Sequence, residues 1–128
     1  MKKRIIVTAA ILGALAVIAG AFGAHGLQSV IPAKDMEIWR TAVQYHFYHV
    51  FALLFLSTIS KYSDKLLRDC YLLFLFGIIC FSGSLYLLAF HSVKGYEWTE
   101  SLGPITPIGG LLFIAGWVVL AVTAIKKL

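Results

Sequence analysis

The chain has 128 residues, of which 60% are hydrophobic and 13% are charged, and its formal net charge is +5. Ordinary soluble domains carry roughly 25% charged residues, whereas here the mean hydropathy is +0.87. This composition excludes a water-soluble globule, a disordered tail and a secreted disulfide scaffold, and it predicts an integral membrane protein. The Lys and Arg residues lie at the ends of apolar segments, so we interpret the charge as a sign of membrane topology and expect no nucleic-acid binding.

Four apolar stretches are each long enough to form a helix that crosses a bilayer, which takes about 20 residues. In chain order they cover residues 5–24, 42–60, 70–90 and 105–125. The segments between them are too short to form a soluble domain. The sequence therefore predicts a single all-α domain over residues 1–128, a membrane bundle of four transmembrane helices.

The first stretch follows Lys2, Lys3 and Arg4, as the apolar region of a signal peptide would. Such regions have about 7–15 residues, and this stretch is longer, so we expect a retained helix. Small residues recur along it at spacings of three and four. One smooth helix face for close packing is expected from them.

The second stretch contains two histidines, His46 and His49, three residues apart and hence on one helix face. Before it, Pro32 is expected to begin a short interfacial helix. Counted inward from residue 41 at 1.5 Å per residue, His46 lies about 7 Å deep and His49 about 12 Å deep.

The third and fourth stretches carry further polar residues at the same end. Ser82, Ser84 and Tyr86 lie in the last turns of the third stretch, which ends at His91. The fourth opens with Thr106, Pro107, Gly109 and Gly110, and the first ends at His25. All four histidines are therefore expected in one half of the membrane, with an apolar opposite half that argues against a channel or pump.

Orientation follows from the distribution of Lys and Arg. If the N-terminus lies inside, eight of these residues face the cytoplasm and three, Lys34, Arg40 and Lys94, lie outside. This bias predicts a multi-pass membrane protein with both termini in the cytoplasm.

The polar residues of the outer half predict a shallow, outward-facing pocket for a small polar ligand or a lipid headgroup. Ionisable groups within membranes are functional candidates because burying them is costly. The candidate pocket residues are His25, His49, Ser82, Ser84, Tyr86 and Thr106. The glycines expected to admit close backbone approach are Gly23, Gly83, Gly109 and Gly110.

Two alternatives stay open. In one, His25 and His49 bind a metal or a haem, with His46 and His91 as further candidate ligands. In the other, the polar residues only join the helices. An enzyme is not expected, because no buried acid is present to orient a Ser–His pair. No cofactor is identified, and the expected partners are the lipid bilayer and, through the small-residue face, another membrane protein or a second copy.

Several motifs together resemble a known family. They are Gly20-Ala21-Phe22-Gly23-Ala24-His25, Tyr45-x-x-x-His49, Phe81-Ser82-Gly83-Ser84-Leu85-Tyr86, Thr106-Pro107-Ile108-Gly109-Gly110 and Ala115-Gly116-Trp117. In this order, and over nearly the whole chain, they are similar to the YgdD-like family of small bacterial inner-membrane proteins, a UPF0382-type domain of unknown function. The resemblance implies a four-helix membrane protein and no established activity, cofactor or substrate. His46 and His91 are not part of the pattern.

Overall fold

The computed structural model describes residues 1–59 and 64–127, and its regular secondary structure is entirely helical. Four long segments are α1 (Lys2–His25), α2 (Ala33–Leu56), a third made of α3 (Asp64–Gly77), the π-helical η2 (Ile78–Ser82) and α4 (Gly83–Leu88), and α5 (Ile105–Lys127). Two short 3₁₀ helices, η1 (Leu27–Ser29) and η3 (Glu97–Leu102), lie in the connections.

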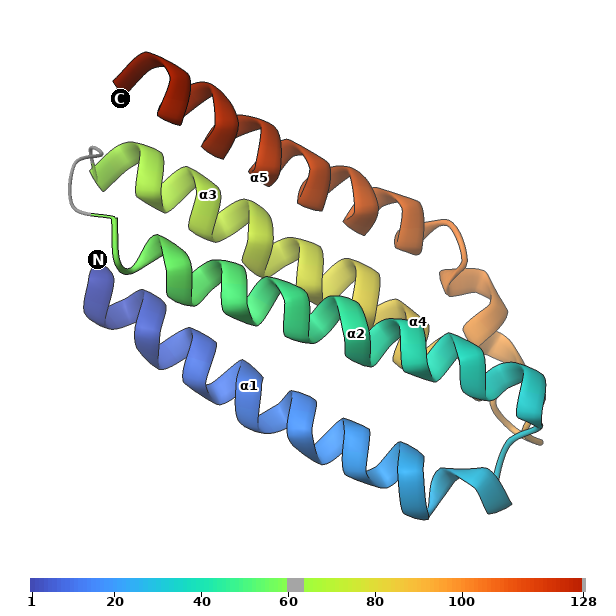
Figure 1. The fold of residues 1–128 in the computed structure, drawn as a ribbon. Coiled ribbons are helices and arrows are strands. Elements are labelled where there is room, and N and C mark those ends of the chain that lie inside the picture. Colours follow the sequence, from blue (N-terminus) through green and yellow to red (C-terminus); the bar gives the residue numbers. More distant parts are fainter. Residues whose placement is uncertain (60–63, 128) are drawn as a thin grey trace.

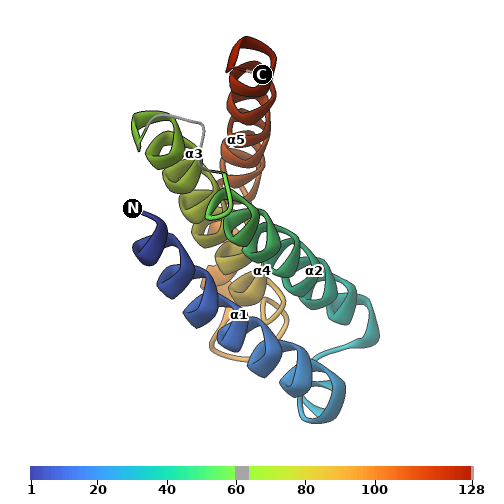
Figure 2. The same ribbon diagram turned by 60° about the vertical axis from the view of Figure 1, so that its left-hand side comes forward.

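The second segment, α2, lies at the centre of the arrangement. It packs against α1 on one side and against α3, η2 and α4 on the other, whereas α5 packs mainly on α3 and η2. Figure 1 shows the beginning of α1 and the end of α5 at the same end of the bundle. In the rotated view of Figure 2, α5 diverges from α1 and α2.

The surface of the bundle is apolar, as expected for a protein solvated by lipid. Large hydrophobic side chains such as Ile18, Phe51, Leu111 and Ile125 are exposed along the helices. By length and composition, three helical segments within the described residues are able to cross a membrane: Lys2–His25, Lys65–Leu88 and Glu97–Lys126. The helix α2 has 24 residues, like α1, but its polar residues lower its mean hydropathy, so it is not among these three segments.

The first and fourth predicted stretches match α1 and α5 within a few residues, and α2 contains residues 42–56 of the second. No separate interfacial helix follows Pro32: this residue is the N-cap of α2, and the helix runs on continuously from Ala33. The helix start expected at Pro32 is confirmed, but the helix is neither short nor separate, because the polar residues 33–41 are as helical as the apolar residues that follow. The helix ends at Leu56, and the predicted end at residue 60 lies outside the described residues.

The third predicted stretch also needs correction. Its helical segment begins at Asp64, not at residue 70, and ends at Leu88. Between α3 and α4, five residues form a π-helical turn, a feature that usually occurs as a local bulge within an α-helix.

Two apolar clusters hold the bundle together. The larger joins all four segments through residues such as Ile5, Leu53, Phe74 and Phe113. The smaller lies toward the other end and is centred on Trp39, which is only 8% exposed. A side chain at Gly23 would meet the Trp39 ring at 2.7 Å, and the Trp39 indole N–H donates to the Ala19 carbonyl at 2.9 Å. The small residues of α1 thus let this large ring lie directly against the helix.

Candidate functional site

His49 lies in the middle of the bundle, 4% exposed, with both ring nitrogens hydrogen-bonded. Its Nδ1 lies 2.8 Å from the Tyr45 carbonyl, and the Trp117 Nε1–H donates to its Nε2 at 3.0 Å. A carbonyl only accepts and an indole N–H only donates, so the ring is neutral with its proton on Nδ1. The ring also stacks on Phe113, with centroids 3.5 Å apart and planes inclined by 5°. His49 therefore joins α2 to α5.

Two more side chains join α2 to the third segment. The Nδ1 of His46 lies 2.8 Å from the Tyr86 hydroxyl, and the Ser82 hydroxyl donates to the Ala42 carbonyl at 2.7 Å. The other nitrogen of His46, Nε2, is buried near the Leu12 carbonyl of α1 but makes no hydrogen bond of normal geometry within the described part of the chain.

Ser84 connects the third segment to α5 instead. Its hydroxyl lies 2.6 Å from that of Thr106 and donates to the Phe81 carbonyl at 3.0 Å. Ser82 and Ser84 are two residues apart, about 200° around a helix, so they face different neighbours. They do not share a pocket.

The predicted glycines differ in their surroundings. At Gly109, an added Cβ would lie 2.3 Å from the Phe81 backbone nitrogen, so α5 touches the backbone of η2 there. Gly23 makes the close approach to Trp39 already described. A Cβ at Gly110 would only touch the Phe81 ring at 3.9 Å, and one at Gly83 would meet nothing within 4 Å. Close approach is therefore found at Gly109 and Gly23, and not at Gly110 or Gly83.

His25 does not join the other candidates. It is exposed at the last turn of α1, whereas contacts of Gly13 with Val50 and of Gly23 with Trp39 set the register of α1 and α2. In that register His49 is level with residue 14, eleven residues before His25, or about 16 Å along the helix at 1.5 Å per residue. The sequence placed His25 near the surface and His49 about 12 Å deeper, so the two side chains are separated along the bundle and do not form one site.

Among the described residues, no three His, Cys, Asp or Glu side chains are arranged so that they could hold a metal ion together. Both His49 nitrogens are engaged with protein groups. The geometry therefore does not favour the metal or haem alternative.

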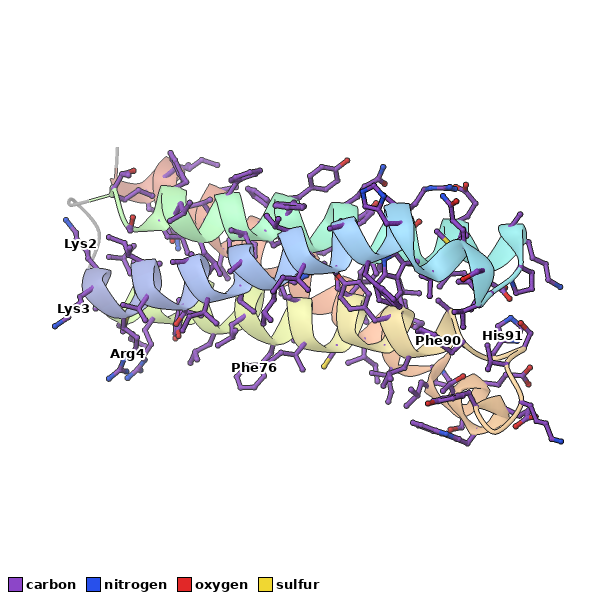
Figure 3. The ribbon with its side chains drawn as sticks, turned by 90° about the horizontal axis from the view of Figure 1, so that it is seen from below. Lys2, Lys3, Arg4, Phe76, Phe90 and His91 are labelled. Atoms are coloured by element: carbon purple, nitrogen blue, oxygen red, sulfur yellow. The ribbon has the colours of Figure 1, made fainter. Side chains whose placement is uncertain are left out.

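A charged cluster that the sequence analysis missed joins the start of α2 to the loop after α4. Asp35 is 2% exposed, and its carboxylate lies 3.0 Å from Nε2 of His91 and accepts from the Ser92 hydroxyl at 2.8 Å. The Nδ1 of His91 lies 3.2 Å from a carboxylate oxygen of Glu100. Figure 3 shows His91 at the end of the bundle opposite Lys2, Lys3 and Arg4. Only the position of Asp35 in a helical first turn was visible in the sequence, and its burial depends on a loop 56 residues away.

This cluster makes the fold sensitive to acid. Burial disfavours the charged Asp35, but hydrogen bonds from Ser92 and His91 and the charges of His91 and Lys34 outweigh it and lower its pKa below 3.8. A lowered carboxyl pKa gives stability that is present above the unfolded-state value and is lost as the pH falls through the folded-state value. We expect the melting temperature in detergent to fall more steeply below pH 4 for the wild type than for Asp35→Asn, which lacks the titrating group. Equal slopes would show that Asp35 does not contribute.

A groove runs between α1 and α2 at the same end as this cluster. Its volume is about 360 Å³, and it is lined by Gly20, Gly23, Ala24, Gln28, Met36, Trp39, Arg40, Val43 and Gln44. A neighbouring hollow of about 360 Å³ shares Gln28, Met36 and Arg40 with it and adds Ile31, Ala33 and Glu37. The Arg40 guanidinium forms an ion pair with Glu37, and both side chains are exposed.

Comparison with known proteins gives a consistent result. Residues 19–110 match the family described as "Protein of unknown function (DUF423)". The chain is 42% identical over 129 residues to the UPF0382 membrane protein YwdK of Bacillus subtilis, covering 98% of this chain and 99% of the relative. It is 44% identical to the UPF0382 membrane protein SERP0230 of Staphylococcus epidermidis over 97% of both chains.

A more distant relative is the UPF0382 membrane protein of Haemophilus influenzae, 37% identical over 99% of this chain and 98% of the relative. No solved structure gives a significant match. The family resemblance expected from the motifs is confirmed, and the chain belongs to the DUF423 family of multi-pass UPF0382 membrane proteins.

Proposed function

We propose that this protein is a non-enzymatic binding protein of the bacterial inner membrane that takes the headgroup of a zwitterionic phospholipid in the groove between α1 and α2. The supporting observation is the groove itself. Gly20 and Gly23 leave its α1 side without side chains, and the Arg40–Glu37 ion pair lies beside it.

The orientation belongs to the same proposal. In this proposal all four long segments cross the bilayer, and α2 does so with its apolar part, residues 42–56, since it lies along α1. The excess of Lys and Arg on one side supports an orientation with both termini in the cytoplasm. The groove then opens in the outer half of the membrane.

The groove is a better candidate site than the polar cluster. Hydrogen bonds across the helices already engage His49, Ser82 and Ser84. Arg40, in contrast, is exposed and pairs only with exposed Glu37 among the described residues.

Charge complementarity selects the headgroup. A phosphate accepts hydrogen bonds from a guanidinium, and an ammonium donates to a carboxylate. Phosphoethanolamine carries both groups and therefore fits Arg40 and Glu37 together. Met36 and Val43 give the adjoining apolar wall for an acyl chain.

The test is native mass spectrometry of the detergent-solubilised protein titrated with dioleoyl phosphatidylethanolamine. We expect Arg40→Gln and Glu37→Gln to retain this lipid about five- to tenfold more weakly, the loss of one charge-assisted contact. Lys34→Gln removes a neighbouring cation outside the groove and should bind like the wild type.

Two alanines on α1 provide a matched steric control. Ala24 lines the groove, and Ala21 is also exposed but lies outside it. Ala24→Leu should block retention of the lipid, and Ala21→Leu should not. The proposal fails if both leucine variants retain the lipid equally.

A structural scaffold is the second candidate function, favoured by the hydrogen bonds that join α2 to the third segment and to α5. In that case groove variants leave lipid retention unchanged, while variants of His49 lower thermal stability. The two candidates are thus separated by the same set of proteins.

A further inference from the structure

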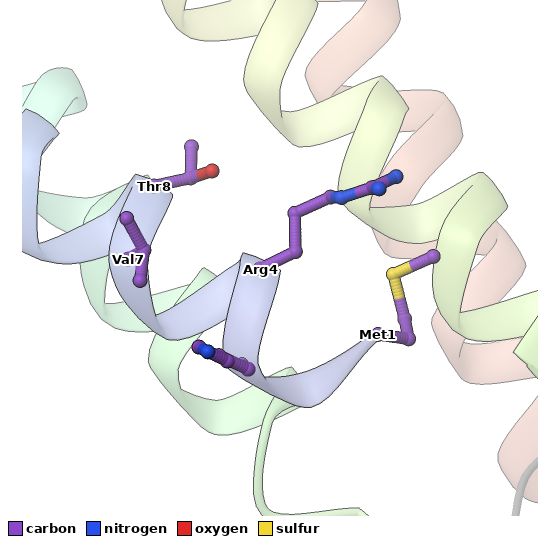
Figure 4. A pocket seen from close by; sticks show the side chains of 5 residues that line it. Met1, Arg4, Val7 and Thr8 are labelled. Carbon is purple, nitrogen blue, oxygen red and sulfur yellow. The ribbon is translucent and has the colours of Figure 1, made fainter.

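A second hollow lies at the opposite end of α1. Its volume is about 680 Å³, and it is lined by Met1, Lys3, Arg4, Val7 and Thr8. Figure 4 shows the side chains of Met1, Arg4 and Thr8 directed to the same side of α1. This agrees with their spacing of three and four residues, which puts them on one helix face.

That side of α1 faces α3. The Thr8 hydroxyl lies 2.8 Å from the Tyr71 hydroxyl, a contact that joins the two helices at the inner limit of the hollow. One turn before Tyr71, α3 carries Arg68, which is exposed. The lining residues of the hollow are Met1 and residues of the first two turns of α1, and α3 comes next to it through the Thr8–Tyr71 contact.

Among the described side chains, those around this hollow are predominantly positive. In the part of the chain that the structure describes, Lys3 and Arg4 form no ion pair. Lys2, Lys65 and Arg68 are exposed nearby on the same two helices, with Asp69 half-buried beside Arg68. At the other end of the bundle, in contrast, the cation Arg40 is paired with Glu37.

An apolar surface continues from the hollow along α1. Val7 lines the hollow, and Ile11, four residues further on the same helix face, is exposed. A ligand that carries an anionic group and an apolar chain would therefore contact cations at one end and aliphatic side chains along its length. Clusters of Lys and Arg at the cytoplasmic end of a membrane helix are known to attract anionic lipids.

We propose that Lys3, Arg4 and Thr8 form a binding site for the phosphate of an anionic phospholipid, separate from the groove between α1 and α2. Arg4 and Lys3 supply the charge, and the Thr8 hydroxyl, held by Tyr71, donates a hydrogen bond. The acyl chain lies along the exposed apolar face of α1. The site does not depend on the groove, since it lies at the other end of the bundle.

The experiment uses the detergent-solubilised protein and dioleoyl phosphatidylglycerol, with dioleoyl phosphatidylcholine as the zwitterionic comparison, in native mass spectrometry. Arg4→Gln and Lys3→Gln should each weaken phosphatidylglycerol retention at least fivefold and leave phosphatidylcholine retention unchanged. Lys2→Gln is the matched control: it removes the same charge from the same turn, outside the hollow, and should change retention less than twofold.

Two results would overturn this assignment. An equal loss in Lys2→Gln and Arg4→Gln would mean diffuse attraction to a basic surface. Calorimetric binding of inorganic phosphate as tight as that of the lipid would mean a free anion site. Melting temperatures of all variants show that they are folded, and Arg40→Gln should leave this site unaffected, which keeps its failure distinct from that of the groove.

Discussion

Of the four predicted glycines, Gly109 should be the one whose replacement by alanine destabilises the protein most. The new Cβ would lie 2.3 Å from the Phe81 nitrogen and 2.7 Å from its Cα. These are backbone atoms inside the π-helical turn, so no side-chain rotation relieves the clash, and α5 must move away from η2. We expect a loss of about 3 kcal/mol, at the upper end of the cost of overpacking, measured by unfolding in mixed micelles.

Gly110 and Gly83 are internal controls for this prediction. A Cβ at Gly110 meets only the edge of a ring at 3.9 Å, and one at Gly83 meets nothing within 4 Å. Alanine is favoured over glycine within a helix by about 1 kcal/mol, so Gly110→Ala and Gly83→Ala should be neutral or stabilising. If Gly109→Ala is as stable as these two, then α5 does not pack on η2 as described.

The second large effect concerns the bond between Trp117 and His49. His49→Phe keeps the ring that stacks on Phe113 but removes the acceptor of the indole N–H, and Trp117→Phe removes the donor. Trp117→Phe leaves Nε2 of the buried His49 unpaired, and His49→Phe leaves the indole N–H of Trp117, which is 46% exposed on the apolar surface, unpaired. We expect each to lose about 1–2 kcal/mol of unfolding free energy.

A double-mutant cycle separates this hydrogen bond from other effects. When both partners are replaced, no unpaired group remains, so the double variant should lose less than the sum of the singles by at least about 0.5 kcal/mol. Additive losses would mean that the two side chains do not interact. Lipid retention in the groove should stay at the wild-type level in all three variants, because both residues lie outside it.

These two predictions concern the same junction. Gly109 brings α5 onto η2, and the resulting proximity places Trp117 against His49 two turns further along. At the other end of the same contact, the hydroxyls of Ser84 and Thr106 join the third segment to the beginning of α5. The polar residues that the motifs emphasise thus hold α5 to the rest of the bundle, whereas the grooves on α1 remain open for ligands.

The sequence by itself determined the class of the protein, the number of long helical segments and the family. Apolar stretches of about 20 residues have few stable alternatives to a helix in a membrane, since lipid offers no hydrogen bonds to the backbone. The boundaries of α1 and α5 followed directly from this rule. The start of α2 did not follow from this rule, because the first turns of this helix are polar.

Only the tertiary structure decided which polar residues meet. Ser82 and Ser84 are neighbours in the sequence but face α2 and α5, respectively. His25 and His49 belong to one motif set but lie far apart along the helices, and Asp35 is buried by a loop distant in the chain. Hydrophobicity fixes how deep a segment lies. The register and rotation of packed helices depend instead on where small residues allow two helices to touch, and this is a property of the pair and not of either sequence alone.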